Sequence, residues 1–192
     1  MITLITGGVK SGKSRRALEL TKSWQFPITF VATASTLDAE MEDRVAKHQI
    51  ERAKFCLDRG GLGICGHSIC SGIKCNDNGF NTIEEQVEID AAAQKGSSKM
   101  ILDCIVMWVN NLLYHKREAD FDLILDRFLL EIKNKDDVVI VSNETNLGNI
   151  PFDPYTRQFN MLLATANRRI AEAADKVELI VCGIPLVIKG HL

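Results

Sequence analysis

The sequence predicts an α/β protein with a mostly parallel sheet flanked by helices, and three observations carry this prediction. Short apolar runs alternate with amphipathic segments along the chain, which is the order of strands joined by crossover helices. The runs are apolar at nearly every position, as expected of strands covered on both faces. A glycine-rich loop joins the first run to the first helix, and the last run follows a Gly-Ile-Pro turn that predicts an antiparallel C-terminal strand.

The first strand, expected over 2–6, leads into the loop that organises the chain. The loop residues are Gly7, Gly8, Val9, Lys10, Ser11, Gly12, Lys13 and Ser14. They fit the G-x-x-x-x-G-K-[ST] pattern of a P-loop, whose backbone N–H groups cradle phosphates at the start of a helix. We expect Lys13 to reach the β- and γ-phosphates and the Ser14 hydroxyl to hold Mg²⁺.

The remaining elements follow in chain order. A helix over 13–24 precedes a strand over 28–32, and the next helix carries an apolar stripe of Leu37, Met41 and Val45 that His48 completes. After a segment without clear periodicity, helical spacing or apolar character predicts helices over 82–94, 106–116, 121–134 and 155–174, and strands over 99–103, 137–142, 177–182 and 186–189.

Polar residues stand just past several of these strands. The strand over 99–103 ends in Asp103, the pattern of a Walker-B carboxylate that holds Mg²⁺ beside a P-loop. Thr33 and the pair Asn143-Glu144 follow two other strands. Because ligands of parallel sheets bind at the carboxyl ends of the strands, these groups should meet at one rim. The sequence therefore predicts a nucleotide site with a second substrate beside it.

Composition narrows the function classes. A length of 192 residues suits a single domain, and a net charge of −2 without a basic block argues against a nucleic-acid partner. The longest apolar run, 100–114, is interrupted by Asp103, Asn110 and Asn111, so we expect no membrane span. The N-terminus lacks the pattern of a signal peptide, and we expect a cytoplasmic protein with reduced thiols.

The segment over about 55–81 departs from the α/β pattern and is interpreted as an insertion. It is rich in glycine and contains Cys56, Cys65, Cys70 and Cys75, with His67 between them. Four thiols could hold Zn²⁺ or an iron–sulfur cluster, but the spacing is not C-x₂-C. The alternative is a mobile loop with incidental thiols. Cys104 and Cys182 lie in apolar runs and are expected to be buried core thiols.

The ordered motifs cover nearly the whole chain apart from this insertion. They are the loop 7–15, Ala32-Thr33-Ala34, the helix 37–48, Thr82-Ile83-Glu84-Glu85, and the segments 102–113, 141–151, 157–168, 173–177 and 183–185. Together they resemble the bifunctional adenosylcobinamide kinase / adenosylcobinamide-phosphate guanylyltransferase family of cobalamin biosynthesis. The resemblance implies a P-loop NTPase (RecA-like) fold, with ATP and GTP as substrates, Mg²⁺ as cofactor, a corrinoid as second substrate and a trimeric homo-oligomer.

The resemblance also implies two reactions. A nucleoside triphosphate phosphorylates adenosylcobinamide, and GMP then passes from GTP to that phosphate, giving adenosyl-GDP-cobinamide and pyrophosphate. By motif position the nucleophile that carries GMP is His48, although periodicity alone favours a histidine at the edge of the core. Further nucleotide contacts implied by motif position are Thr33, Ala34, Ser35, Gln49, Ile50, Glu51, Arg52, Glu84 and Asp103.

Two alternatives remain beside the bifunctional enzyme. The insertion could have removed guanylyl transfer and left a kinase, or the chain could be a nucleotide-dependent switch. Glu84 matches a carboxylate that would bind the guanine base, but it could also be an exposed acidic residue in the first turn of a helix. The sequence leaves the preferred phosphate donor, ATP or GTP, open.

Overall fold

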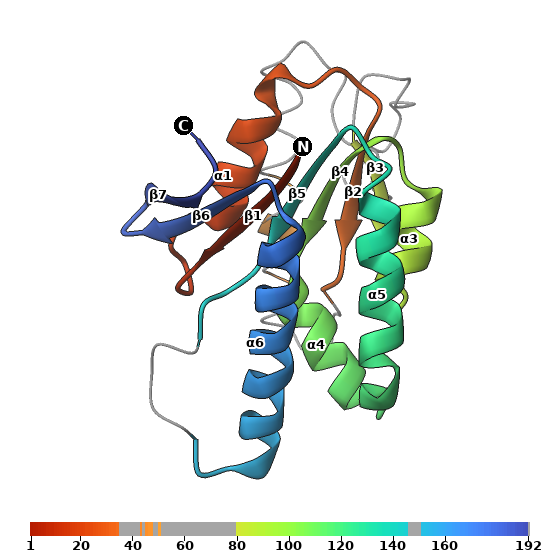
Figure 1. Cartoon of the computed structure of the whole chain (residues 1–192), viewed down its shortest axis with the longest axis vertical. Helices are drawn as coiled ribbons and strands as arrows, with labels where there is room; N and C mark the ends of the chain where they lie inside the picture. The colour runs from red at the N-terminus through yellow and green to blue at the C-terminus, as the bar shows by residue number, and fades with distance from the viewer. Residues whose placement is uncertain (35–42, 44, 48–49, 51–79, 146–150, 192) are drawn as a thin grey trace.

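A seven-stranded sheet in the order β3-β2-β4-β5-β1-β6-β7 forms the centre of the computed structural model, which describes residues 1–34, 43, 45–47, 50, 80–145 and 151–191. The strands are β1 (Ile2–Gly7), β2 (Ile28–Ala32), β3 (Phe80–Glu84), β4 (Lys99–Asp103), β5 (Asp137–Val141), β6 (Lys176–Val181) and β7 (Ile184–Lys189). All neighbours pair in parallel except β6 and β7. The parallel arrows of Figure 1 therefore point toward one rim.

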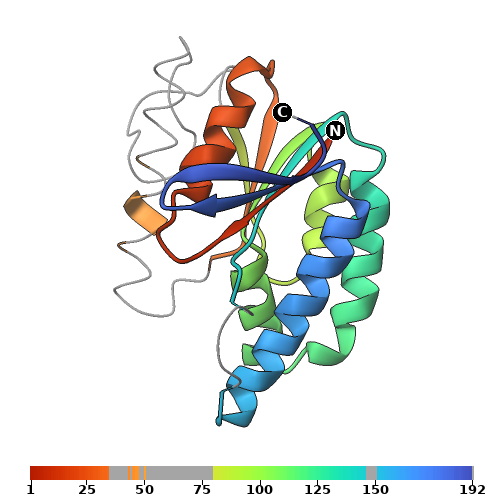
Figure 2. The ribbon, with the colours of Figure 1, turned by 60° about the vertical axis from the view of Figure 1, so that its left-hand side comes forward.

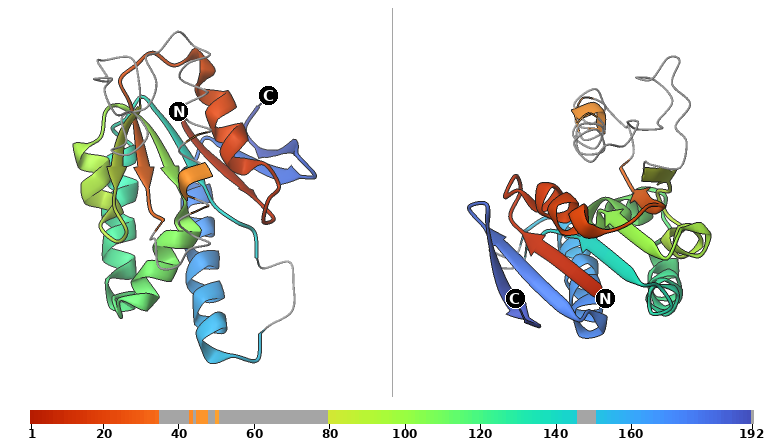
Figure 3. Two further views of the ribbon diagram at one scale, coloured as in Figure 1. Left: turned by 180° about the vertical axis from the view of Figure 1, so that it is seen from behind. Right: turned by 90° about the horizontal axis from the view of Figure 1, so that it is seen from above.

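Helices cover both faces of this sheet. They are α1 (Lys13–Leu20), α3 (Ile89–Lys95), α4 (Ile105–Tyr114), α5 (Phe121–Ile132) and α6 (Pro154–Ala173), with short 3₁₀ turns at Thr21–Ser23 and Glu118–Asp120. Helix α1 lies on one face, and α3, α5 and α6 lie on the other (Figure 2). In the view along the sheet from above, β3 and β7 lie toward opposite sides of the molecule (Figure 3).

Strand alternation divides the core into two clusters. In β4, Met100 and Leu102 pack with α3, α4, α5 and α6, whereas Ile101 between them packs with Ala17 and Leu18 of α1. All three β4 side chains are fully buried. Both faces of this strand are therefore apolar, which is why its sequence is a continuous hydrophobic run. The predicted fold class, a mostly parallel sheet flanked by helices with an antiparallel C-terminal strand, is confirmed.

Two expectations about this fold are wrong. The segment 82–94 is not one helix, because β3 occupies Phe80–Glu84 and α3 begins only at Ile89. Cys182 is not a core thiol, since it is exposed in the turn between β6 and β7, with a φ of 52°. Cys104 is half-buried after β4. Within the described part of the chain, none of the helices has the length and apolar character that crossing a membrane requires.

A buried ion pair joins the first helix to β6. The Glu178 side chain is fully buried, and its carboxylate accepts two hydrogen bonds from the Arg16 guanidinium, at 2.8 and 2.9 Å. Lys176 lies 3.0 Å from the same carboxylate. Hydrogen bonding to Arg16 is the largest cause that holds the pKa of Glu178 below its usual value, against the desolvation that raises it. The pair fixes α1, and with it the end of the P-loop, against the sheet.

Glu178→Gln is expected to lower the free energy of unfolding at pH 7 by about 2 kcal/mol, because Arg16 loses its charged acceptor in a buried place. The folded-state pKa is depressed, so this stability exists above the pKa of the unfolded carboxyl and is lost as pH falls through the folded-state value. Urea unfolding from pH 7 to pH 3 should show the difference between wild type and variant shrinking.

Glu172→Gln is the matched control, since Glu172 pairs with Arg168 on the exposed side of α6. An exposed pair contributes little, so this control should change stability by less than about 0.5 kcal/mol. A pH-independent loss in Glu178→Gln would contradict the ionic explanation.

Candidate active site

The P-loop turns sharply where β1 ends. Gly7 has a φ of 148°, and a Cβ atom there would lie 2.5 Å from the backbone oxygen of Ile180. Gly12, with a φ of 98°, is the left-handed residue directly before α1. Both conformations favour glycine. Gly7 is thus required by the close approach of β6, and Gly12 by the entry into the helix.

Lys13 lies at the first position of α1 and is 8% exposed. Its Nζ donates a hydrogen bond of 2.6 Å to the carbonyl of Gly8, across the mouth of the loop. The Ser11 hydroxyl is buried and has no hydrogen-bond partner among the described residues. The loop therefore combines a fixed cation with the positive end of a helix, a combination suited to phosphate oxygens.

A cavity of about 840 Å³ opens beside the loop. Its lining combines the P-loop with groups that follow three other strands. The lining residues are Val9, Lys10, Ser11, Gly12, Lys13, Ser14, Arg15, Asp43, Lys47, Asp103, Cys104, Val141, Asn143, Cys182 and Gly183. The structure thus brings the predicted Lys13, Ser14 and Asp103 into one cavity.

Ser14 and Asp103 offer the oxygen ligands that a magnesium site requires. Both line the cavity, Ser14 from the first turn of α1 and Asp103 from the last position of β4. Mg²⁺ is usually held by one or two protein oxygens together with water and substrate phosphates, so this donor set fits the ion. Within the described residues there is no cluster of three or more His, Cys, Asp or Glu side chains that could hold a metal.

Thr33 is fully buried, and its hydroxyl forms hydrogen bonds with the backbone of the residue that follows Asp103. The Oγ1 atom accepts from the Cys104 N–H at 2.8 Å and donates to the Cys104 carbonyl at 2.7 Å. The Thr33 carbonyl in turn accepts from Asn111 of α4 at 2.8 Å. Thr33 therefore fixes the segment that carries Asp103. Among the described residues that line the cavity, neither Thr33 nor Ala34 is present.

Glu84 is the last residue of β3 and is exposed at the same rim, with Ala32 as its partner in β2. It lies outside the described lining of the cavity. Glu84 therefore ends a strand and does not lie in the first turn of a helix, the alternative that the sequence suggested. Three strands, β2, β4 and β5, separate β3 from the P-loop strand β1 in the sheet.

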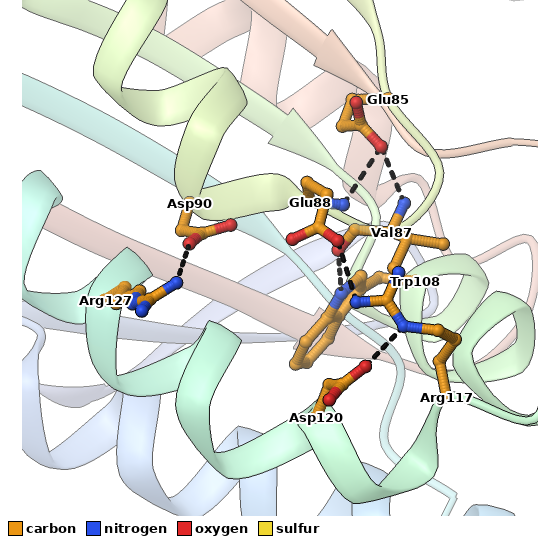
Figure 4. A network of polar contacts seen from close by, with 8 residues as sticks. All are labelled: Glu85, Val87, Glu88, Asp90, Trp108, Arg117, Asp120 and Arg127. Atoms are coloured by element: carbon orange, nitrogen blue, oxygen red, sulfur yellow. Dashed lines mark hydrogen bonds and ion pairs between the residues drawn. The ribbon is translucent and has the colours of Figure 1, made fainter.

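Side chains of Glu85, Trp108 and Arg117 hold the loop that follows β3 in place (Figure 4). The Glu85 carboxylate accepts from the N–H groups of Val87 and Glu88, both at 2.9 Å. The indole N–H of Trp108 donates to the Val87 carbonyl at 2.8 Å, and Arg117 pairs with Glu88 at 2.8 Å. These contacts fix the end of β3 relative to α4 and thereby constrain where the Glu84 backbone lies.

Several predicted site residues lie outside the described residues. These are Ser35, His48, Gln49, Glu51 and Arg52, together with Cys56, Cys65, Cys70 and Cys75. The metal hypothesis for the four cysteines therefore stays a prediction. Ile50 is described as helical and exposed, and it is not part of the lining.

Sequence reasoning assigned no site role to seven residues of the cavity lining, which are Arg15, Asp43, Lys47, Cys104, Val141, Cys182 and Gly183. Asp43 and Lys47 line it from the segment that precedes His48, and Cys182 and Gly183 line it from the turn between β6 and β7. Asn143 was placed at the rim without a role. The sequence shows that Asp43 and Lys47 are polar residues of one expected helix, but it does not show that they face the P-loop.

Comparison with protein families gives one match over most of the chain. The cobinamide kinase / cobinamide phosphate guanyltransferase family matches residues 3–56 and 74–188. The unmatched stretch between them, 57–73, lies within the cysteine-rich segment.

Curated relatives align over their full length. The bifunctional adenosylcobalamin biosynthesis protein CobP of Pseudomonas aeruginosa is 27% identical over 198 residues, covering 100% of this chain and 99% of its own. The protein CobU of Salmonella typhimurium, of the same description, is 28% identical over 203 residues, covering 98% and 100%.

Among solved structures, the flagellar accessory protein FlaH of Methanocaldococcus jannaschii superposes with a TM-score of 0.50 at 13% identity, over 99% of this chain and 78% of that protein. At this identity the likeness concerns the fold alone.

Proposed function

Because the chain belongs to the cobinamide kinase / cobinamide phosphate guanyltransferase family, we propose that it carries out two consecutive reactions of cobalamin biosynthesis. The chain is a transferase, bifunctional as its family and relatives are described. The proposed first reaction phosphorylates the aminopropanol hydroxyl of adenosylcobinamide. The second transfers GMP from GTP to that phosphate. The observation that carries the proposal is the family match, whose two matched segments include the P-loop, Lys47 and Asp103, residues that line one cavity.

In the kinase reaction the hydroxyl oxygen attacks the γ-phosphorus, the bond between that phosphorus and the β,γ-bridging oxygen breaks to release the nucleoside diphosphate, and the hydroxyl proton passes to solvent water. Lys13 would neutralise charge on the β- and γ-phosphates, and the α1 N-terminus adds its dipole. Ser14 and Asp103 would hold Mg²⁺, which supplies further charge neutralisation and orients the phosphates. Phosphoryl transfer needs little more from the protein than such positioning and electrostatic stabilisation.

In the guanylyl transfer we propose His48 as the nucleophile. An imidazole nitrogen attacks the α-phosphorus of GTP, a P–N bond forms, and the bond to the β-phosphate breaks to release pyrophosphate. A phosphate oxygen of adenosylcobinamide phosphate then attacks the same phosphorus, and the P–N bond breaks to restore the histidine. Dividing the transfer into two displacements is the logic of covalent catalysis. Support comes from Lys47, which precedes His48 in the chain and lines the cavity.

The remaining nucleotide contacts are proposed by motif position. Glu84 would accept hydrogen bonds from the N1–H and exocyclic amine of guanine, and Arg52 would pair with phosphate. Ser35, Gln49 and Glu51 would contact the nucleotide between them, and Thr33 would act through the backbone it fixes. Ala34 and Ile50 lie outside the described lining of the cavity, so only their motif position favours a contact. A trimer remains an expectation from the same family.

The two activities should be measured separately with wild-type protein. One assay supplies γ-labelled ATP or GTP with adenosylcobinamide, and the other supplies α-labelled GTP with adenosylcobinamide phosphate. We expect phosphate transfer in the first and GMP transfer with pyrophosphate release in the second. With α-labelled GTP alone, the protein should retain label that is acid-labile and stable in base, as expected of a phosphoramidate. Phosphorylation without GMP transfer would leave a kinase only, and turnover of neither corrinoid would overturn the proposal.

A further inference from the structure

The cations that line the cavity come from two different parts of the chain. Lys10, Lys13 and Arg15 belong to the P-loop and the first turn of α1, whereas Lys47 belongs to a separate helical segment. This segment, drawn in orange, lies on the same side of the sheet as α1 (Figures 2 and 3). Among the described residues of the lining, Lys47 is therefore the one cation that reaches the cavity from outside the phosphate loop and its helix.

The helical segment presents two opposite charges to the cavity. Asp43 and residues 45–47 are helical, and the side chains of Asp43 and Lys47 are exposed and line the cavity. A spacing of four residues places two side chains on one face of a helix. Val45 and Ala46, which lie between them in the chain, are half-buried. The face that carries Asp43 and Lys47 is therefore the face that this segment turns toward the cavity.

The P-loop can neutralise only one side of a bound polyphosphate. Lys13 is fixed within the loop by its 2.6 Å hydrogen bond to the Gly8 carbonyl, and the N-terminus of α1 lies on the same side. Phosphate oxygens that point away from the loop need a cation or water of their own, and charge-assisted hydrogen bonds are the strongest that they accept. A lysine carries a compact ammonium group on a long, flexible stem, so Lys47 can supply such a contact from an exposed position.

We propose that Lys47 is a further substrate-contacting residue, whose ammonium group binds the β- and γ-phosphates of the nucleoside triphosphate from a wall of the cavity that the P-loop does not form. The inference rests on the proposed function, since it requires a triphosphate in the cavity. Lys13 and Lys47 then hold the same phosphates between two elements of the chain. Because Lys47 directly precedes His48, the contact also ties the segment that carries the proposed nucleophile to the nucleotide.

Asp43 should act on nucleotide affinity in the opposite direction. Its carboxylate lines the same cavity from the same helix face, so its negative charge repels the phosphates and competes with them for the Lys47 ammonium group. Removal of the Asp43 charge should therefore strengthen binding, whereas removal of the Lys47 charge should weaken it. If the two side chains only supported the fold of the helix, both changes would weaken binding or leave it unchanged.

The test is titration calorimetry with the β,γ-methylene analogue of GTP in Mg²⁺, on wild type, Lys47→Gln, Lys47→Arg and Asp43→Asn. We expect Lys47→Gln to bind the analogue about 5-fold more weakly, because a charge-assisted contact is lost while the cost of ordering an exposed lysine is no longer incurred. Lys47→Arg should stay within about 2-fold of wild type, since a guanidinium also binds phosphate. Asp43→Asn should bind about 2- to 3-fold more tightly, because a negative charge facing the phosphates is removed.

Lys22→Gln is the control for the loss of an exposed positive charge, because Lys22 lies in the turn after α1 and outside the described lining of the cavity. It should bind the analogue as wild type does. The assignment would be overturned by equal affinities of wild type and Lys47→Gln, by a loss in Lys47→Arg as large as in Lys47→Gln, or by weaker binding in both Lys47→Gln and Asp43→Asn. Failure of wild type to bind the analogue would instead count against the proposed function.

Discussion

Lys13→Ala is expected to lower both phosphoryl transfer and guanylyl transfer by about 10²- to 10³-fold, the loss typical of one preorganised electrostatic contact to a transition state. The physical reason is the position of Lys13, which is 8% exposed at the first turn of α1 and lies across the P-loop from the carbonyl of Gly8. A mobile surface lysine would contribute less, because it would have to be ordered first. Steady-state kinetics with each substrate measures both losses.

The control for lost charge is Lys22→Ala, on the exposed turn after α1. It should leave both activities within about 2-fold of wild type. Lys13→Ala also removes the hydrogen bond to Gly8, so urea unfolding must show that the variant is folded at the assay temperature. If only one activity falls in a folded Lys13→Ala protein, the two reactions would not share one phosphate cradle, and the single-cavity interpretation would be wrong.

The strands that sequence reasoning found are those buried on both faces. In β4 and β5 nearly every residue is apolar, and this pattern is visible without knowing which strand is the neighbour. Strand β3 was missed because it is an edge strand, with Phe80 as its fully buried residue and with polar Asn81, Thr82 and Glu84 beside it. Its pairing with β2 decides its conformation, and pairing is not a local property.

The hairpin of β6 and β7 shows a different limit of sequence reasoning. Residues 186–189 were predicted as a last, antiparallel strand, and the structure confirms this strand, but it also shows that the side chains of Ile184, Leu186 and Ile188 are exposed at the edge of the sheet. Cys182 was expected in the core because it lies in an apolar run. A run of apolar residues predicts a strand, but whether a layer covers it depends on strand order.

The site residues also fall into those that a local motif identifies and those whose place depends on strand order. The P-loop is a contiguous motif, so its glycines, Lys13 and Ser14 could be assigned from spacing alone. The positions of Asn143 and Thr33 could not, because they depend on which strands are neighbours. Asn143 acquires its place from β5 lying between β1 and β4, and Thr33 from the bonds of its hydroxyl to Cys104.

The guanylyl-transfer proposal makes the second large prediction, since His48→Asn should separate the two activities. Asparagine retains polar character and hydrogen-bonding capacity but has no imidazole nitrogen to attack phosphorus. We expect retained label from α-labelled GTP to disappear and GMP transfer to fall by about 10³-fold or more, the scale of losing an essential nucleophile. Phosphorylation of adenosylcobinamide should stay within about 3-fold of wild type, because attack at the γ-phosphorus uses the substrate hydroxyl.

His115→Asn is the matched control, since His115 is an exposed histidine at the end of α4 and makes a 3.4 Å contact with Gln86. Its labelling and both activities should equal those of wild type. Direct attack of the corrinoid phosphate on GTP would need no covalent intermediate, so transfer by His48→Asn at the wild-type rate would exclude the histidine route. Equal losses of both activities would mean that His48 supports nucleotide binding, because loss of a nucleophile at the α-phosphorus affects one reaction and spares the other.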